Sequence, residues 1–254
     1  MYKLLQDLTW IEAKETFKTA KLAVIPVGSI EQHGPHLPLI NDAATAFELA
    51  KMAAEKAKAE IIIVPPIVLG VSDHHMPFPG TLTLSPQTLI ALTMDICKSL
   101  KAHGIKRVVL INGHGGNAPA LTIALRQIKE VLQMKAALVN YWELIPDVIK
   151  STIQSDVWGH ACEFETSIAL AIYPDRVRKD ALKKAEMKDV KLPYVKPGLE
   201  LAVHVSLDWS DHTSTGSIGD PTLATKEKGE KIINAAVERM AIFLDEFAEF
   251  NHLR

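Results

Sequence analysis

The chain has 254 residues, of which 48% are hydrophobic and 23% are charged, and its formal net charge at pH 7 is −2 with histidines counted as neutral. This composition allows one large core or two modest ones and offers no basic stripe that would favour nucleic acid. No apolar run approaches the ~20 residues of a membrane-spanning helix, and the N-terminus lacks the apolar stretch of a signal peptide. The two cysteines, Cys97 and Cys162, do not suggest a disulfide framework, so we expect a cytoplasmic protein.

Apolar runs of strand length recur along the chain, with helix-like segments between them. The expected strands are Leu22–Val27, Ile61–Val64, Arg107–Ile111 and Ala136–Asn140. The expected helices are Ala43–Lys58, a segment from the N-cap Ser85 to about His103, Ala118–Leu132 and about Thr225–Phe250. This alternation predicts a three-layer α/β/α sandwich with a mostly parallel central sheet. We expect residues 1–254 to form a single domain, with Lys179–Pro197 as a surface excursion.

A polar cluster follows the first expected strand, where a parallel sheet places its ligands. Glu31, His33 and Asp42 lie between Val27 and the expected helix at Ala43. Because Glu31 and His33 are two residues apart, their side chains point the same way on an extended segment. Together with Asp42 they supply oxygen and nitrogen ligands for a metal ion.

A second cluster, Asn112–Asn117, follows the third expected strand and surrounds His114 with glycines. The glycines let the backbone turn sharply and approach a ligand closely, which would present His114 to it. A glycine-rich turn whose histidine and asparagine satisfy only local backbone groups is the alternative. Because both clusters end parallel strands of one sheet, we expect them to converge on one crevice.

A third cluster, Trp158–Ser167, contains His160 and Glu163, which share a face if both lie on a helix, while Glu165 would point elsewhere. The alternative for its acidic residues is that they complement the dipole of a helix N-terminus. Cys162 beside His160 could be a nucleophile, but a thiol among so many hard ligands is more simply incidental.

Two further loops carry polar residues. Gly70–Thr81 contains His74 and His75 and is interpreted either as a proline-fixed surface loop or as a wall of the substrate pocket. Asp208–Pro221 is interpreted as a polar loop and helix N-cap region. The sequence contains no Walker phosphate loop, no dinucleotide glycine fingerprint after a strand and no Gly-x-Ser-x-Gly elbow.

Five motifs of the chain, and their order, resemble those of the creatininase (creatinine amidohydrolase) family. The motifs are Gly28–Gly34 with Asp42, Phe78–Thr81, Asn112–Asn117, His160–Ser167 and Gly216–Pro221. The resemblance implies a hydrolase of amide C–N bonds that binds two divalent metal ions. It also implies a homohexamer, for which composition offers no independent argument.

The resemblance implies that Glu31 and His114 hold one metal ion, that His33 holds the other and that Asp42 bridges them. His160 would be the catalytic acid and base. Creatinine-hydrolysing members carry a carboxylate where this chain has Gly116, so creatinine itself is in doubt as the substrate. Relatives with the glycine pattern include a deformylase of a formylamino-pyrimidine and a peptidase that trims a small modified peptide. We expect Glu163 to replace the missing carboxylate.

These observations predict a metal-dependent amidohydrolase that cleaves a C–N bond of a small cyclic amide, a formamide or a related metabolite. The metal ions would be Zn, with Mn or Fe as alternatives. The expected substrate contacts are His75, Gly115, Gly116, Asn117 and Trp158. Two other hypotheses stay open: a metal-dependent isomerase or lyase, and a metabolite- or metal-binding regulator on a hydrolase scaffold. We expect no nucleic-acid or membrane partner.

Overall fold

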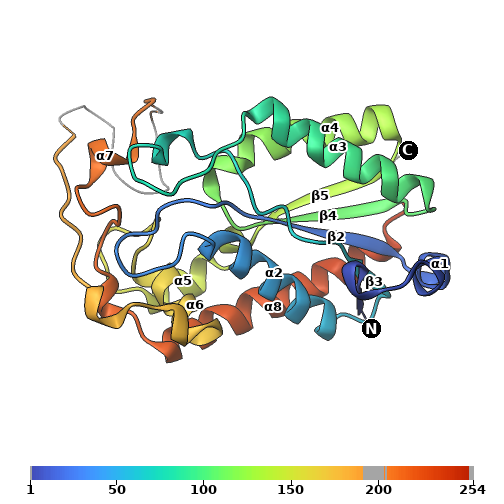
Figure 1. Cartoon of the computed structure of the whole chain (residues 1–254). Helices are drawn as coiled ribbons and strands as arrows, with labels where there is room; N and C mark the ends of the chain where they lie inside the picture. Colours follow the sequence, from blue (N-terminus) through green and yellow to red (C-terminus); the bar gives the residue numbers. More distant parts are fainter. Residues whose placement is uncertain (1, 191–202, 204, 252–254) are drawn as a thin grey trace.

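The computed structural model describes residues 2–190, 203 and 205–251, and in it five parallel strands form one sheet (Figure 1). The strands are β1 (Tyr2–Leu4), β2 (Leu22–Val27), β3 (Ile61–Ile63), β4 (Arg107–Asn112) and β5 (Lys135–Asn140). Their order in the sheet is β1-β3-β2-β4-β5, and every pairing is parallel. The predicted parallel sheet is therefore confirmed, with β1 as an additional edge strand.

Helices cover both faces of the sheet, so the α/β/α sandwich predicted from the sequence is confirmed (Figure 1). One layer contains α2 (Asn41–Lys56), α5 (Pro146–Thr152), α6 (Glu163–Ile172) and α8 (Lys226–Glu249). The other layer contains α3 (Pro86–Ala102) and α4 (Ala118–Leu132). Two smaller helices, α1 (Trp10–Thr19) and α7 (Trp209–His212), lie towards opposite ends of the molecule.

The central strand β2 shows why an apolar run becomes a doubly covered strand. All of its residues are buried, and alternate side chains enter the two cores. Leu22 and Val24 pack towards α2 and α8, whereas Ala23 and Ile25 pack towards α3 and α4. Complete burial of one such aliphatic side chain contributes about 1.5–3 kcal/mol. The sandwich is thus stabilised from both sides of the same strand.

Helix boundaries follow the expected local chemistry. The Ser85 side chain accepts a hydrogen bond from the Thr88 amide, and Pro86 occupies the first turn of α3, as predicted. Part of the excursion expected at Lys179–Pro197 falls outside the described residues. In the part of the chain that the structure describes, no helix has the length and apolar character needed to span a membrane.

Two glycines at the strand ends allow α2 to begin close to the sheet. A Cβ at Gly28, after β2, would lie 2.2 Å from the backbone of Ala43. A Cβ at Gly113, after β4, would lie 2.3 Å from the carbonyl oxygen of Asp42. Only a residue without a side chain fits such approaches. The first turn of α2 therefore sits directly against the carboxyl ends of β2 and β4.

Candidate metal centre

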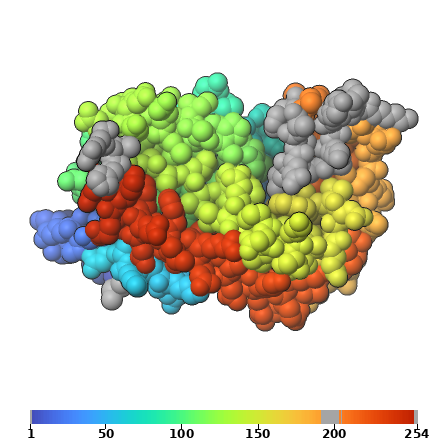
Figure 2. Space-filling model, turned by 180° about the vertical axis from the view of Figure 1, so that it is seen from behind, coloured from blue at the N-terminus to red at the C-terminus, as the bar shows by residue number. Residues whose placement is uncertain are grey.

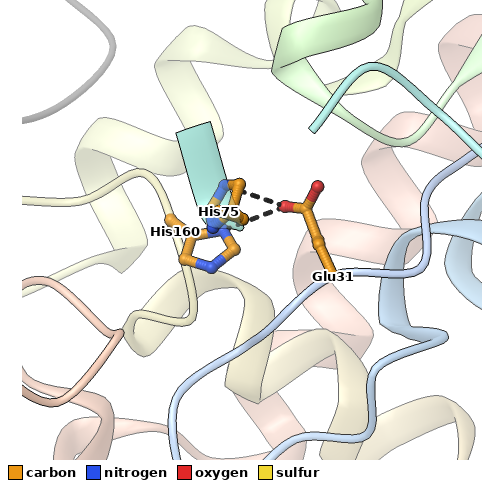
Figure 3. Close-up of side chains that lie close together, drawn as sticks. All are labelled: Glu31, His75 and His160. Carbon is orange, nitrogen blue, oxygen red and sulfur yellow. Dashed lines mark ion pairs between the residues drawn. The ribbon is translucent and has the colours of Figure 1, made fainter. Parts of the chain in front are cut away.

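Buried acidic and imidazole side chains converge at the carboxyl ends of the strands. Glu31 and His33 come from the loop after β2, Asp42 from the first turn of α2 and His114 from the segment after β4. His160 lies in the turn that precedes α6, and Figure 3 shows its ring beside Glu31 and His75. The convergence predicted for the two strand-end clusters is confirmed.

The first group that could hold a metal ion consists of Glu31, Asp42 and His114. The Nδ1 atom of His114 lies 3.1 Å from Glu31 Oε2 and 3.2 Å from Asp42 Oδ2. Its other ring nitrogen, Nε2, lies 2.9 Å from the carbonyl oxygen of Val71 and can donate to it. A ring held by such a bond presents Nδ1 as a metal ligand. The hydroxyl of Ser72 donates to Glu31 Oε2 over 2.6 Å and so orients that carboxylate.

The second group lies on the other side of Asp42 and is formed with His33 and Glu165. The His33 Nε2 atom is 2.7 Å from Asp42 Oδ1 and 3.8 Å from Glu165 Oε2. The other nitrogen of the ring, Nδ1, lies 3.2 Å from the backbone carbonyl of Glu31 and can donate to it. His33, His160 and Glu165 also form a compact set of possible ligands. Asp42 thus offers one carboxylate oxygen to each group.

The charges of the two groups are strongly coupled. Burial alone would lower the pKa of His33, but the carboxylate of Asp42 raises it to about 10. Burial likewise opposes protonation of His114, yet Glu31 and Asp42 raise its pKa well above the ordinary value. Burial raises the pKa of Glu165 to about 7, with His33 opposing. The pocket therefore has a negative field that attracts cations, whether protons or metal ions.

The side chains fit a pair of divalent cations. Glu31 Oε1, His33 Nε2 and Asp42 Oδ2 are buried and have no hydrogen-bond partner among the described residues. Buried polar atoms normally have partners, so three unpartnered ones at one point indicate a missing ligand. Carboxylate oxygens and imidazole nitrogens suit Zn, Mn or Fe.

Glu163 does not lie with these ligands, contrary to the sequence-based expectation. Its carboxylate is 2.5 Å from the ammonium group of Lys228 and accepts hydrogen bonds from the backbone amides of Gln154 and Ser155. The expectation assumed that His160 and Glu163 share a helix, but α6 begins only at Glu163. Ala161 has φ +47°, a left-handed turn that ends any helical relation to His160.

Glu165, not Glu163, is the acidic residue of α6 that lies in the second group. Two helical residues separated by one other point about 200° apart, so Glu165 faces the metal centre while Glu163 faces α8. The backbone amide of Ala161 donates to Glu165 Oε2 over 2.5 Å and helps to hold it. The third-cluster acid that the sequence argument placed away from the site is therefore the one that reaches it.

Gly116 leaves no room for a side chain. A Cβ there would lie 2.4 Å from both His114 Nε2 and the carbonyl oxygen of Val71. These are the two atoms whose hydrogen bond orients the ring of His114. A carboxylate at this position is therefore incompatible with the local backbone, and the carboxylate beside His33 in the second group comes from α6.

A cavity of about 370 Å³ opens beside the metal centre. Four of the expected substrate contacts line it, namely His75, Gly115, Gly116 and Trp158. Asn117 instead uses its side chain to accept from the Val71 amide and to donate to the carbonyl of Gly28, so it joins loops. The Asn117 side chain therefore satisfies backbone groups that are distant in the sequence, not the local ones that the alternative interpretation assumed.

Two side chains at this site were not predicted from the sequence. Trp209 lines the cavity, and its ring centroid lies 5.1 Å from that of His75 and 4.8 Å from that of His160. Gln32 lies beneath the same two imidazoles. A bulky apolar residue within the polar loop Asp208–Pro221 was the available signal for Trp209. Cys162 is buried with its pKa raised to about 12, which does not suit a nucleophile at neutral pH.

Comparison with known protein families identifies the family to which the chain belongs. Residues 6–244 match the family described as creatininase, or creatinine amidohydrolase, so the chain belongs to the creatininase family and is a hydrolase of that family. A mycofactocin precursor peptide peptidase from Mycolicibacterium smegmatis is 31% identical and aligns over 90% of this chain and 87% of its own length. A creatinine amidohydrolase from Pseudomonas putida is 28% identical over 92% of this chain and 93% of its own.

Solved creatininase structures share the fold. One described as creatininase Mn is 28% identical, covers 97% of this chain and 99% of its own, and superposes with a TM-score of 0.78. A creatininase variant described as Zn-Zn type is 28% identical over 96% of this chain and 98% of its own, with a TM-score of 0.77. Mn and paired Zn ions thus occur in the family, in line with the ligand types found here.

Proposed function

We propose that this protein is a hydrolase that cleaves an amide C–N bond with the help of two divalent metal ions. The observation that carries the proposal is the position of Asp42, whose two carboxylate oxygens face two separate ligand groups. Glu31 and His114 would complete one site, and His33 and Glu165 the other. Zn is our first choice of metal, with Mn and Fe as alternatives.

Two adjacent divalent ions, when bound, can lower the pKa of a water molecule and polarise a carbonyl oxygen. The protein's own residues supply positioning and proton transfer. His160 lines the cavity, and its Nε2 atom lies 2.7 Å from the backbone carbonyl of Gln32, to which it can donate. Its Nδ1 atom is then free to accept a proton from water and to deliver it to the leaving nitrogen. Such a proton transfer typically accelerates the reaction roughly 10²–10⁴-fold.

The protonation state of His160 suits a base. Burial, reinforced by His33, holds its pKa well below the ordinary value. The imidazole is therefore neutral at pH 7 and has a lone pair to offer. The walls of the cavity add Trp158 and Trp209, whose flat faces favour a planar group such as an amide.

The substrate we propose is a small cyclic amide, a formamide or a related metabolite. The relatives named for a peptide and for creatinine show that the family accepts different C–N bonds. Gly116 is the position at which the chain departs from the pattern of creatinine-hydrolysing members. The isomerase or lyase and the regulator remain competing hypotheses, but a regulator has no need of a free base such as His160.

The test is turnover of a panel of cyclic amides, formamides and short peptides by enzyme reconstituted with Zn, Mn or Fe. We expect the wild-type protein to hydrolyse at least one amide, with addition of one water and formation of a carboxylate and an amine, and Asp42→Ala, which loses its metals, to hydrolyse none. His160→Ala should keep both metals and lose turnover. A product formed without addition of water would favour the isomerase or lyase. Tight binding of an amide without any turnover would favour the regulator.

We also propose, on the family resemblance, that the protein assembles as a homohexamer in the cytoplasm. Exposed apolar side chains such as Trp10 and Ile11, which are 75% and 59% exposed, are compatible with contacts between subunits. Light scattering at micromolar concentration should give about six times the mass of one chain. A monomer would contradict the proposal for assembly without affecting the proposed chemistry.

A further inference from the structure

The side chain of Gln32 lies between the imidazoles of His75 and His160. Its Nε2 atom is 2.9 Å from His75 Nδ1, 3.0 Å from His160 Nε2 and 2.9 Å from the backbone carbonyl of Gly216. Gln32 is almost fully buried, so all three contacts are made away from water. An amide nitrogen has only two hydrogens, and therefore one of the three contacts is not a hydrogen bond that Gln32 donates.

The orientation of the Gln32 amide is fixed at both ends. The backbone amide of Gly34 donates to its Oε1 atom over 3.0 Å, so this atom is the oxygen. The carbonyl of Gly216 faces its Nε2 atom and also accepts from the indole nitrogen of Trp209 over 2.7 Å. Rotating the amide by 180° would place two oxygens together at Gly216 and two donors together at Gly34. One of the two amide hydrogens therefore goes to Gly216.

The position of the proton on His160 determines which group accepts the other amide hydrogen of Gln32. His160 Nε2 is 2.7 Å from the backbone carbonyl of Gln32, and a bare ring nitrogen so close to a carbonyl oxygen would be repelled. His160 therefore carries its proton on Nε2 and donates it to that carbonyl. The contact between Gln32 Nε2 and His160 Nε2 is then not a hydrogen bond, and the remaining amide hydrogen points to His75.

The tautomer of His75 follows. Because Nδ1 accepts from Gln32, the proton of the neutral ring is on Nε2. This nitrogen lies 3.2 Å from Glu31 Oε1, but Glu31 Oε1 has no aligned hydrogen bond among the described residues. His75 also lines the cavity. Its N–H is thus available to a group that enters the cavity, and Figure 3 shows the ring beside His160 and opposite Glu31.

We propose that Gln32 is a positioning residue that holds both His75 and His160 in the tautomer protonated on Nε2, His75 through its side-chain amide and His160 through its backbone carbonyl. His75 then donates a hydrogen bond from Nε2 to the substrate's carbonyl oxygen, while His160 accepts a proton at Nδ1. The role of His75 towards the substrate rests on the proposed amide hydrolysis, whereas the assignment of the tautomers does not. The two rings are close neighbours, with centroids 4.4 Å apart, and one glutamine gives them complementary roles. A donor aimed at the developing oxygen charge stabilises the transition state more than the bound substrate.

The first measurement needs no turnover. In the Zn-loaded protein labelled with ¹⁵N-histidine, protonated and bare imidazole nitrogens differ clearly in chemical shift. His75→Gln and His160→Gln identify the two sets of resonances. We expect Nε2 to be protonated in both rings of the wild-type protein, with His75 Nδ1 acting as an acceptor and His160 Nδ1 bare. A proton on Nδ1 of His75 would overturn the proposal.

The second measurement uses Gln32→Glu, whose carboxylate has no hydrogen to donate. His75 must then carry its proton on Nδ1, which removes the donor from the cavity. We expect the His75 resonances to exchange and kcat to fall roughly 100-fold with little change in KM. Unchanged resonances together with unchanged kcat would overturn the proposal.

Gln127→Glu is the matched control, because it introduces the same charge at an exposed position of α4. It should behave as the wild type in every measurement. If Gln32→Glu does not fold, Gln32→Met removes the amide without adding charge and should still lower kcat, whereas full activity of this variant would refute the role of Gln32. Wild-type protein with the expected tautomers but no amide turnover would refute the proposed function alone.

Discussion

Glu163 and Glu165 are two residues apart, yet they point to opposite sides of α6. Glu165 faces His33, and Glu163 is paired with Lys228 of α8. Both carboxylates are shielded from water, so each depends on its own cationic partner. Their roles should therefore separate cleanly when each is replaced.

We expect Glu165→Ala to bind one metal ion instead of two, because the second group loses its carboxylate beside His33. Glu163→Ala should keep two ions but lose about 3 kcal/mol of stability, because Lys228 would keep a largely buried charge without its partner. Elemental analysis and denaturant unfolding measure the two effects. Loss of an ion from Glu163→Ala, with both retained by Glu165→Ala, would reverse the assignment.

His36 should make stability depend on pH. Burial, with a contribution from His33, lowers its pKa to about 4, and the ring bonds to the Thr166 hydroxyl over 2.8 Å. The unfolded chain takes up this proton below its ordinary pKa near 6.5, whereas the folded chain resists until about pH 4. Stability is therefore complete above about pH 6.5 and is lost as the pH falls towards 4, by at most roughly 3 kcal/mol.

His36→Gln keeps a polar group that can reach Thr166 but cannot titrate. We expect its melting temperature to fall less than that of the wild type between pH 6.5 and pH 4. Both proteins should be measured without metal, so that loss of ions at low pH does not contribute. Parallel melting curves for the two proteins across this range would contradict the role of His36.

The residues of the site that could be predicted are those whose position depends on a strand end. Glu31, His33 and His114 follow β2 and β4 directly, so the parallel sheet alone brings them together. Glu165 could not be predicted in this way, because its direction depends on where α6 begins. The left-handed turn at Ala161 sets that beginning, and alanine gives no sequence signal for such a backbone.

At the scale of elements, α6 and α8 pack closely at Gly229. A Cβ at this position would lie 2.0 Å from the carbonyl oxygen of Ser167 on α6. Alanine in place of glycine would favour an isolated helix by about 1 kcal/mol. However, the added Cβ would collide with backbone, and such overpacking typically costs about 1–3 kcal/mol. The cost of the collision should therefore exceed the gain in helix propensity.

We therefore expect Gly229→Ala to be destabilised by about 1 kcal/mol and to bind the second metal ion more weakly, because α6 carries Glu165. Glu230→Ala is the control, since its side chain is exposed and, among the residues that the structure describes, pairs only with Lys226 at the surface. Denaturant unfolding and Zn titration report the two effects. A variant as stable as the wild type with unchanged Zn affinity would show that α6 and α8 can separate without cost.

The elements that the sequence predicted are those with a strong hydrophobic signal. β2 and β4 are apolar runs, and α8 has apolar residues at helical spacing, so each was expected close to its observed bounds. α1 has no buried residue and was not among the expected helices. β1 has only three residues, which is too short for an alternating pattern. α1 and β1 lie at the N-terminal end of the chain, and the short helix α5 was also not among the expected elements.

At the scale of the whole molecule, the candidate metal centre joins segments that are distant in the sequence. The residues that we propose as its ligands come from the loop after β2, the start of α2, the segment after β4 and the first turn of α6. The unfolded chain cannot present these groups together, so bound ions stabilise only the folded state. Without metal, the carboxylates of Glu31, Asp42 and Glu165 lie close together with only imidazoles to balance them.

Removal of metal should consequently lower the stability of the entire fold. At a free metal concentration of 100 times Kd, each ion contributes about 2.7 kcal/mol, which corresponds to a rise in melting temperature of roughly 5–10 °C for a chain of this size. We expect a chelator to lower the melting temperature of the wild type and added Zn to restore it. Asp42→Ala, which lacks the shared ligand, should melt at the same temperature with and without the chelator, and Glu165→Ala should show about half of the wild-type shift. If neither the chelator nor Zn changes the melting temperature of the wild-type protein, these buried groups hold no stabilising ion, and the two-metal proposal is refuted.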